Sequence, residues 1–282
     1  MKHINYQIHS SENLKLFGRA WLSEKPDPKG VVNLIHGLGE HSGRYHHIGD
    51  ALNEAGYHLA AIDLRGHGLS DGKRGDIPSF ERVLDDVGLF LQDSQRRFGN
   101  LQTHFLYGHS LGANIVVNFG LRRSAELAGI IATSPSFRLA FDPPKLTLFM
   151  GKILAKISPS FTMNNNLELD ALSRDQAIVQ AYKDDVYVHN RISAKLAMSL
   201  FESGQYALDH AHEFTLPLLL MHGTEDRIGS SKATQEFADK AYENVELVLW
   251  EGYYHETHND IGKEKVIAKL IAWIDEQTVA YQ

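Results

Sequence analysis

The sequence contains no cysteine among its 282 residues. That absence excludes disulfide bonds, a thiolate nucleophile, and zinc or iron–sulfur sites that need cysteine ligands. The sequence also contains no apolar run long enough to cross a bilayer, and its first residues lack the apolar core of a signal peptide. We therefore expect a cytoplasmic location.

Clustered positive charge is missing as well. The formal net charge is -7, and no block of lysine and arginine interrupts the sequence. This balance argues against nucleic acid as a partner and against strong electrostatic attraction to anionic membranes. The hydrophobic content of 43% and charged content of 22% are typical of an ordinary globular protein.

Signals for bound metals and nucleotides are also absent. Four histidines between positions 36 and 47 form a loose cluster, but no carboxylate stands at ligand spacing beside them. No G-x-G-x-x-G loop opens a helix, so a dinucleotide site is not expected. The sequence predicts a protein that uses neither metal nor cofactor.

Short apolar strands alternate with amphipathic helices along most of the chain. Eight strands are expected, the first two as an antiparallel hairpin, at residues 4–8, 14–21, 31–35, 59–62, 105–107, 130–133, 216–221 and 246–250. Helical periodicity covers residues 46–56, 80–98, 113–125, 231–241 and 263–277. Such alternation predicts an α/β fold with a mostly parallel eight-stranded sheet and helices on both faces.

The alternation of strands and helices is interrupted between residues 136 and 212, where helix-like segments occur without a clear strand. We interpret this segment as a helical cap inserted between two strands, over the edge of the sheet where ligands bind in open α/β folds. The expected core therefore comprises residues 1–135 and 213–282.

Residues 108–112 read GHSLG and match G-x-S-x-G, the nucleophile elbow. An apolar strand candidate precedes them at 104–107, and residues 113–119 can open a helix. The chain must turn sharply at such an elbow, and only glycine leaves room for the turn on either side of the serine. We therefore predict that Ser110 is an exposed nucleophile at a helix N-terminus.

A serine hydroxyl needs a base, and the base needs a carboxylate to orient it. The acid is expected after the strand at 216–221, where we favour Asp226 and keep Glu225 as the alternative. The base is expected after the last strand, where His255 is favoured over His258. Ser110, Asp226 and His255 then follow in the chain order of an α/β-hydrolase triad.

A tetrahedral intermediate also needs two fixed donors for its oxyanion. One is expected to be the backbone N–H of Leu111, which directly follows the nucleophile. The other is assigned to Leu38, within the HGLG run at residues 36–39, because its glycines let the backbone approach the substrate closely.

Residues 36–45 (HGLGEHSGRY) resemble the oxyanion loop of the monoacylglycerol lipase family. Residues 63–70 (DLRGHGLS) and the elbow at 108–112 are similar to other motifs of that family. The resemblance extends over residues 30–135 and 214–260, and the segment between them matches loosely. It implies an α/β-hydrolase fold with the triad and the oxyanion donors assigned above.

The same resemblance implies a polar head-group pocket formed by Glu40, Arg44 and His258. An internal salt bridge between Glu40 and Arg44 is the alternative interpretation. Glu256, directly after the expected catalytic histidine, departs from the family pattern. This departure suggests a lysophospholipase-like bacterial branch with another head-group preference.

A helix is also expected near residues 144–157, with large apolar side chains along one face. Leu146 and Met150 on that face are candidates for the wall of an acyl-chain tunnel. The same face is also a candidate for transient membrane contact, and ordinary packing of a cap helix on the core is the alternative.

Taken together, these features predict a serine carboxylester hydrolase that cleaves monoacylglycerols or similar single-chain lipid esters through an acyl-enzyme. A short-chain esterase, thioesterase, peptidase or lysophospholipase with the same triad is the alternative enzyme. A low-turnover ligand-binding receptor with the same fold is the alternative from another class. The oligomeric state cannot be predicted from the sequence.

Overall fold

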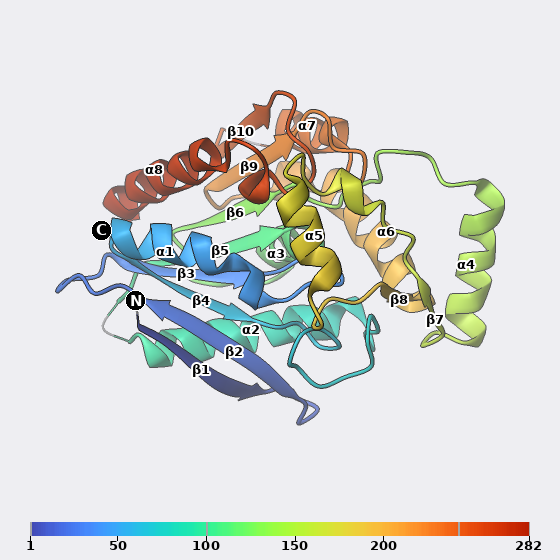
Figure 1. The fold of residues 1–282 in the computed structure, drawn as a ribbon, viewed down its shortest axis with the longest axis horizontal. Coiled ribbons are helices and arrows are strands. Elements are labelled where there is room, and N and C mark those ends of the chain that lie inside the picture. Colours follow the sequence, from blue (N-terminus) through green and yellow to red (C-terminus); the bar gives the residue numbers. More distant parts are fainter. Residues whose placement is uncertain (1, 100, 242, 282) are drawn as a thin grey trace.

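The computed structural model describes residues 2–99, 101–241 and 243–281. Its centre is an eight-stranded sheet in the order β1-β2-β4-β3-β5-β6-β9-β10 (Figure 1). The strands are β1 (Lys2–His9), β2 (Lys15–Leu22), β3 (Gly30–Ile35), β4 (Tyr57–Ile62), β5 (His104–His109), β6 (Gly129–Thr133), β9 (Leu218–Gly223) and β10 (Val245–Trp250). All eight expected strands are therefore present, with ends shifted by a few residues.

In this sheet, only β2 runs opposite to the direction shared by the other seven strands. It pairs antiparallel with β1 on one side and with β4 on the other, and the five remaining pairs are parallel. Parallel neighbours place their carboxyl ends at one edge of the sheet, where successive loops meet. The predicted hairpin and the mostly parallel sheet are both confirmed.

The helices outside the β6–β9 segment all occur where helical periodicity predicts them. They are α1 (His46–Ala55), α2 (Phe80–Arg97), α3 (Leu111–Arg122), α7 (Ser231–Lys240) and α8 (Lys263–Tyr281). Helices α1 and α8 cover one face of the sheet, and α2, α3 and α7 cover the other (Figure 1). The sheet is therefore the middle of three layers.

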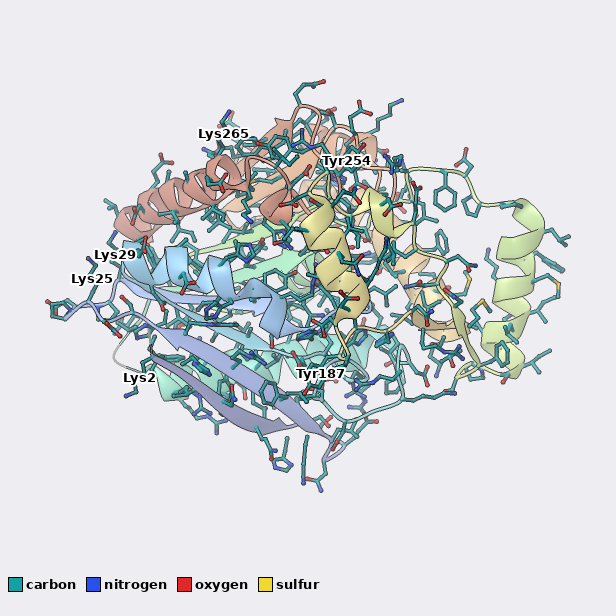
Figure 2. The ribbon with its side chains drawn as sticks, in the orientation of Figure 1. Lys2, Lys25, Lys29, Tyr187, Tyr254 and Lys265 are labelled. Carbon is teal, nitrogen blue, oxygen red and sulfur yellow. The ribbon has the colours of Figure 1, made fainter. Side chains whose placement is uncertain are left out.

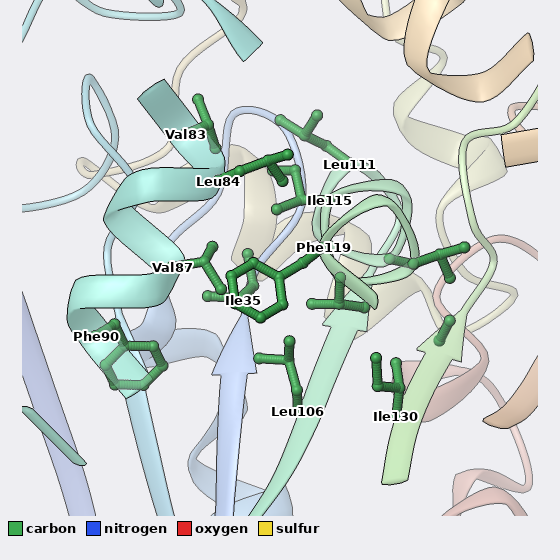
Figure 3. Close-up of a cluster of buried hydrophobic side chains, with 14 of the residues drawn as sticks. Ile35, Val83, Leu84, Val87, Phe90, Leu106, Leu111, Ile115, Phe119 and Ile130 are labelled. Atoms are coloured by element: carbon green, nitrogen blue, oxygen red, sulfur yellow. The ribbon is translucent and has the colours of Figure 1, made fainter. Parts of the chain in front are cut away.

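Each face of the sheet has its own apolar core. On β5, Phe105 and Tyr107 point into the cluster beneath α1 and α8, while Leu106 between them packs against α2 and α3 (Figure 3). Alternate residues of a strand point to opposite faces, so a strand buried on both sides is apolar throughout. This burial makes the central strands a rigid base for the loops at their carboxyl ends.

The segment between β6 and β9 adds no strand to the large sheet. It contains α4 (Lys145–Ile157), β7 (Thr162–Asn164), α5 (Gln176–Asp184), β8 (Arg191–Ser193) and α6 (Ala194–Asp209). The expectation of no strand here is wrong, because β7 and β8 pair as a short antiparallel ribbon. Three residues per strand are too few to leave a periodic signal in the sequence.

The two ends of this segment differ in how they pack. Helix α6 lies on α3, and its buried Leu196, Ala207 and Leu208 belong to the main core. Helix α4 contacts α6 and lies at one end of the molecule, where Leu146, Phe149, Met150 and Ile157 are each more than half exposed (Figures 1 and 2). Within the described residues, no helix is both long and apolar enough to span a bilayer.

Candidate active site

Ser110 occupies the sharp junction between β5 and α3. Its backbone has φ 54° and ψ -113°, a left-handed conformation that is costly for any residue but glycine. A Cβ on Gly108 would collide with the carbonyl of Gly112, and a Cβ on Gly112 would collide with the carbonyl of Ile35. The glycines on both sides of Ser110 are therefore required by close backbone packing, as the elbow motif predicts.

The structure brings Ser110, His255 and Asp226 into one hydrogen-bonded chain. Ser110 Oγ lies 2.9 Å from His255 Nε2, and His255 Nδ1 lies 2.7 Å from Asp226 Oδ2. These side chains follow the carboxyl ends of β5, β10 and β9, which meet at the same edge of the sheet. The alternative acid, Glu225, is exposed to solvent.

The Asp226 carboxylate is held by more than His255. Its Oδ1 accepts the backbone N–H groups of Ile228 and Gly229 at 2.7 and 2.9 Å. Its Oδ2 also lies 2.9 Å from Nε2 of His222, a buried residue at the end of β9. The carboxylate therefore has a fixed orientation, and His222 is a supporting residue that sequence reasoning did not assign.

Burial and neighbouring charges have opposite effects on the pKa values of Asp226 and His255. Burial favours a neutral Asp226, but His255 and His222 outweigh it and hold the pKa of that carboxyl far below its usual range. Burial also lowers the pKa of His255, yet the charge and hydrogen bond of Asp226 raise it above the ordinary histidine value. The pair is therefore arranged to stabilise an imidazolium.

The residues expected to supply the oxyanion donors lie in the same cavity as Ser110. Leu38 and Leu111 both line the cavity that contains Ser110, and Leu111 is the first residue of α3. The N–H at that position has no acceptor within its own helix, so it is available to a ligand. The loop carrying Leu38 is anchored by Glu40, whose Oε1 accepts the backbone N–H of Gly37 at 2.6 Å.

Glu40, Arg44 and Glu256 form a buried charge cluster at the edge of the cavity. Arg44 donates to Glu40 at 2.7 Å and makes a two-pronged contact with Glu256 at 2.7 and 2.8 Å. Burial raises the pKa of Glu40, but Arg44, with nearby histidines, lowers it to about 2. The internal salt bridge kept as an alternative is present, and Glu40 and Glu256, but not Arg44, are among the described residues that line the cavity.

His258 lies behind this cluster and away from the cavity. Its ring stacks on Tyr45 at 5.1 Å between centroids and meets His109 edge-on at 4.6 Å. The residue is 1% exposed, and burial lowers its pKa well below the ordinary value. Its expected place in a head-group pocket is therefore wrong, because the 3₁₀ turn over Thr257–Asn259 directs it into the protein.

A cavity of about 470 Å³ opens above Ser110. The β6–β9 segment supplies much of its apolar wall, through Met163, Ile192, Ala197, Leu200 and Phe201. Figure 1 shows α5 and α6 beside the strand ends where this cavity lies. The cavity is therefore bounded by the sheet edge on one side and by this segment on the other.

Leu146 and Met150 do not belong to the described lining of this cavity, which corrects their assignment as a tunnel wall. They are 71% and 54% exposed on α4. Helix α4 turns Gly151 toward Met198 of α6, while Leu146, Phe149 and Met150 remain exposed. Helical periodicity predicts an apolar face but not which neighbour, if any, that face meets.

Sequence reasoning missed two serines that contact the triad. Ser134 Oγ donates to the backbone carbonyl of His255 at 2.6 Å, and Ser136 Oγ lies 3.2 Å from Ser110 Oγ. Both follow the carboxyl end of β6, and that position is the one signal that could have identified them. In the described part of the chain, no group of three or more histidine, aspartate or glutamate residues is arranged so that it could hold a metal ion.

The chain is similar in sequence to a known family of hydrolases and to several of its members. The profile of the Hydrolase_4 family, described as serine aminopeptidase, S33, matches residues 26–262. The monoacylglycerol lipase of Mycolicibacterium smegmatis is 34% identical over 250 residues, which are 88% of this chain and 89% of that protein. An abhydrolase domain-containing protein of Dictyostelium discoideum is 38% identical over 97% of this chain, which spans 29% of that protein's length.

Solved structures with a similar fold include lipases of the same name. The crystal structure of Paleococcus ferrophilus monoacylglycerol lipase has a TM-score of 0.84 and 32% identity, covering 93% of this chain and 99% of that one. A soluble variant of monoglyceride lipase from Saccharomyces cerevisiae, in complex with a substrate analog, has a TM-score of 0.85 and covers 98% of this chain and 94% of that one. At 23% identity, this second similarity supports the fold alone.

Replacement of Arg44 by methionine should destabilise the fold by about 3–5 kcal/mol at pH 7, because it leaves two buried carboxylates without their cation. The depressed pKa of Glu40 stabilises the wild type above the unfolded value near 4.5, and this contribution is lost as the pH falls toward 2. The difference between wild type and Arg44→Met should therefore shrink between about pH 5 and pH 3. The difference in unfolding free energy is measured by urea unfolding at several pH values across this range.

The matched control is Arg138→Met, which removes the exposed pair with Glu236 and should cost under about 1 kcal/mol. An Arg44→Met deficit that does not change with pH would contradict the electrostatic account of this cluster.

Proposed function

Because the chain belongs to the monoacylglycerol lipase-like serine hydrolases of the Hydrolase_4 (S33) family, we propose that it cleaves the ester bond of monoacylglycerols with Ser110 as nucleophile. The family and the α/β-hydrolase fold expected from the sequence are confirmed. The protein is a serine ester hydrolase. The observation that carries the assignment of its residues is the chain Ser110–His255–Asp226, with contacts of 2.9 and 2.7 Å at the floor of the cavity.

In the proposed reaction, Ser110 Oγ attacks the ester carbonyl while His255 Nε2 takes its proton. The oxyanion accepts hydrogen bonds from the backbone N–H groups of Leu38 and Leu111. His255 returns the proton to the departing glycerol oxygen, which leaves an acyl group on Ser110. A water molecule then gives a proton to His255 and attacks the acyl carbon, and the fatty acid is released as Ser110 regains its proton. Asp226 holds the tautomer and stabilises the imidazolium throughout.

The cavity supports a single-chain lipid ester as substrate. Its apolar wall suits an acyl chain, and two carboxylates, those of Glu40 and Glu256, line it close to the triad. Glu40, Arg44 and Glu256 together carry one net negative charge, and the two arginines on the cavity wall, Arg138 and Arg227, are each paired with a glutamate. The site therefore repels a phosphate and tolerates an uncharged glycerol. This electrostatic argument favours monoacylglycerols over lysophospholipids.

We further propose that residues 136–212 act as the cap of a core formed by residues 1–135 and 213–282. Within this cap, α6 is the anchored part and α4 is the part that makes transient contact with a membrane. Leu146, Phe149, Met150 and Ile157 are each more than half exposed on α4. An exposed apolar helix face of this kind suits the surface of a lipid aggregate. A cytoplasmic location belongs to the same proposal, since a chain without cysteine has no disulfide to form elsewhere.

The proposed function is tested by Ser110→Ala together with a competition profile. The variant should fold normally, lose ester turnover and lose labelling by a fluorophosphonate, because only one hydroxyl is removed. The wild type should prefer monoacylglycerols over lysophospholipids, acyl-thioesters and short esters at equal concentration. Full activity in Ser110→Ala, labelling at another residue, or a preference for lysophospholipids would each reject the proposal, and no turnover at all would favour a receptor.

The activity should rise with pH through the ionisation of His255, because acylation needs the neutral imidazole. Since Asp226 raises the pKa of His255, the midpoint in kcat/KM should lie above the ordinary value of about 6.5. Asp226→Asn should lower that midpoint and reduce kcat by on the order of 10⁴. The control is Glu225→Gln, the exposed neighbour, which should leave both unchanged. A wild-type midpoint below 6.5, or a damaging Glu225→Gln, would contradict the assignment.

Membrane contact through α4 is tested by the double variant Phe149→Glu/Ile157→Glu. Binding to neutral phosphatidylcholine vesicles should weaken by more than roughly tenfold, because burial of one large apolar side chain contributes about 1.5–3 kcal/mol. Turnover of a water-soluble nitrophenyl butyrate should stay unchanged. The control, Val279→Glu/Tyr281→Glu, adds the same charges at the exposed end of α8 and should bind vesicles as the wild type does. Equal losses in the two variants would argue against a specific role for α4.

A further inference from the structure

We infer that Ser136 is a further catalytic residue, whose hydroxyl donates a hydrogen bond to Ser110 Oγ and assists the formation of the acyl-enzyme. The inference rests on the proposed role of Ser110 as nucleophile. Its starting observation is the distance of 3.2 Å between the two serine oxygens. Ser136 also lines the cavity above the nucleophile, where a reacting ester would lie.

The backbone of Ser136 is fixed by the elbow itself. Its N–H donates to the carbonyl of Ser110 at 3.2 Å, and its carbonyl accepts Nδ2 of Asn114 at 2.8 Å. Asn114 belongs to the first turns of α3, directly after the nucleophile. The position of the Ser136 hydroxyl relative to Ser110 therefore does not depend on the distant parts of the β6–β9 segment.

The direction of the bond between the serines follows from a count of protons. His255 Nδ1 faces the ionised Asp226 and carries the proton of a neutral imidazole, so Nε2 is the acceptor. Ser110 must therefore donate its only proton to Nε2, 2.9 Å away. Its Oγ has no proton left for Ser136, so Ser136 is the donor in the state that reacts.

A donor at this position favours the reaction step rather than substrate binding. Negative charge grows on Ser110 Oγ as its proton moves to His255, and a hydrogen bond to a charged acceptor is stronger than one to a neutral acceptor. Once Oγ has bonded to the acyl carbon, it is an ester oxygen and accepts only weakly. The hydroxyl of Ser136 thus contributes most while the nucleophile is being deprotonated.

The surroundings of Ser136 strengthen this interpretation. Its neighbours on the cavity wall include Phe137, Leu139 and Leu200, all apolar. A hydroxyl on such a wall interrupts the surface that would bind an acyl chain. An apolar residue at this position would leave Ser110 without this donor.

The test compares Ser136→Ala with Ser136→Thr, which keeps the hydroxyl and adds one methyl group. The rate constant of acylation is measured from the pre-steady-state release of nitrophenol, with fluorophosphonate labelling of Ser110 as a second measure. Ser136→Ala should slow both by roughly tenfold, without a change in thermal midpoint or in the substrate dissociation constant obtained from the concentration dependence of the burst rate. Ser136→Thr should stay within about twofold of wild type.

Two results would overturn the inference. Acylation of Ser136→Ala at the wild-type rate would show that the hydroxyl takes no part in acylation. An equal loss of acylation rate in Ser136→Thr would assign the effect to packing. Neither result affects the proposed function, whose own tests are the substrate profile, the Ser110→Ala variant and labelling of the wild type at Ser110. Absence of that labelling would instead reject the proposed function and this inference together.

Discussion

The site depends first on the close approach of α3 to β3. Gly112 leaves no room for a Cβ beside the carbonyl of Ile35, so the start of α3 rests directly on the end of that strand. Ser110 reaches this position only in a left-handed conformation, and the loop that follows Ile35 carries Leu38. One backbone contact therefore sets both the direction of the nucleophile and its distance from the proposed oxyanion donors. The strain at Ser110 is held in place by strands that are buried on both faces.

A second constraint is electrostatic and links two loops that follow distant strands of the sheet, β3 and β10. Glu40 anchors the N–H of Gly37 in the loop after β3, and Glu256 directly follows His255 after β10. Arg44 binds both carboxylates and stacks over the ring of Tyr182 in α5 at 4.7 Å. A single guanidinium thus connects the proposed oxyanion loop, the loop of the base and the β6–β9 segment. Its two-pronged geometry suits this task better than the point charge of a lysine.

The β6–β9 segment divides into parts with different physical roles. Helix α6 shares the apolar core with α3, which anchors it to the layer of helices on that face of the sheet. Helix α4 leaves Leu146, Phe149, Met150 and Ile157 mostly in solvent, which is unfavourable unless another apolar phase covers them. This contrast is the basis for proposing that the protein takes its substrate from a lipid surface while the triad stays in a rigid frame.

The sequence by itself determined the strands and helices of the core, the nucleophile elbow, and the order of Ser110, Asp226 and His255. Each of these leaves a local signal, either a period of 2 or 3.6 residues or a motif at a strand end. Tertiary structure alone decided that Arg44 binds Glu256 across 212 residues, that His258 turns inward, and that Ser136 meets Ser110. It also decided that Leu146 faces solvent. Such contacts join distant segments, and a periodic pattern does not specify which surface a side chain will meet.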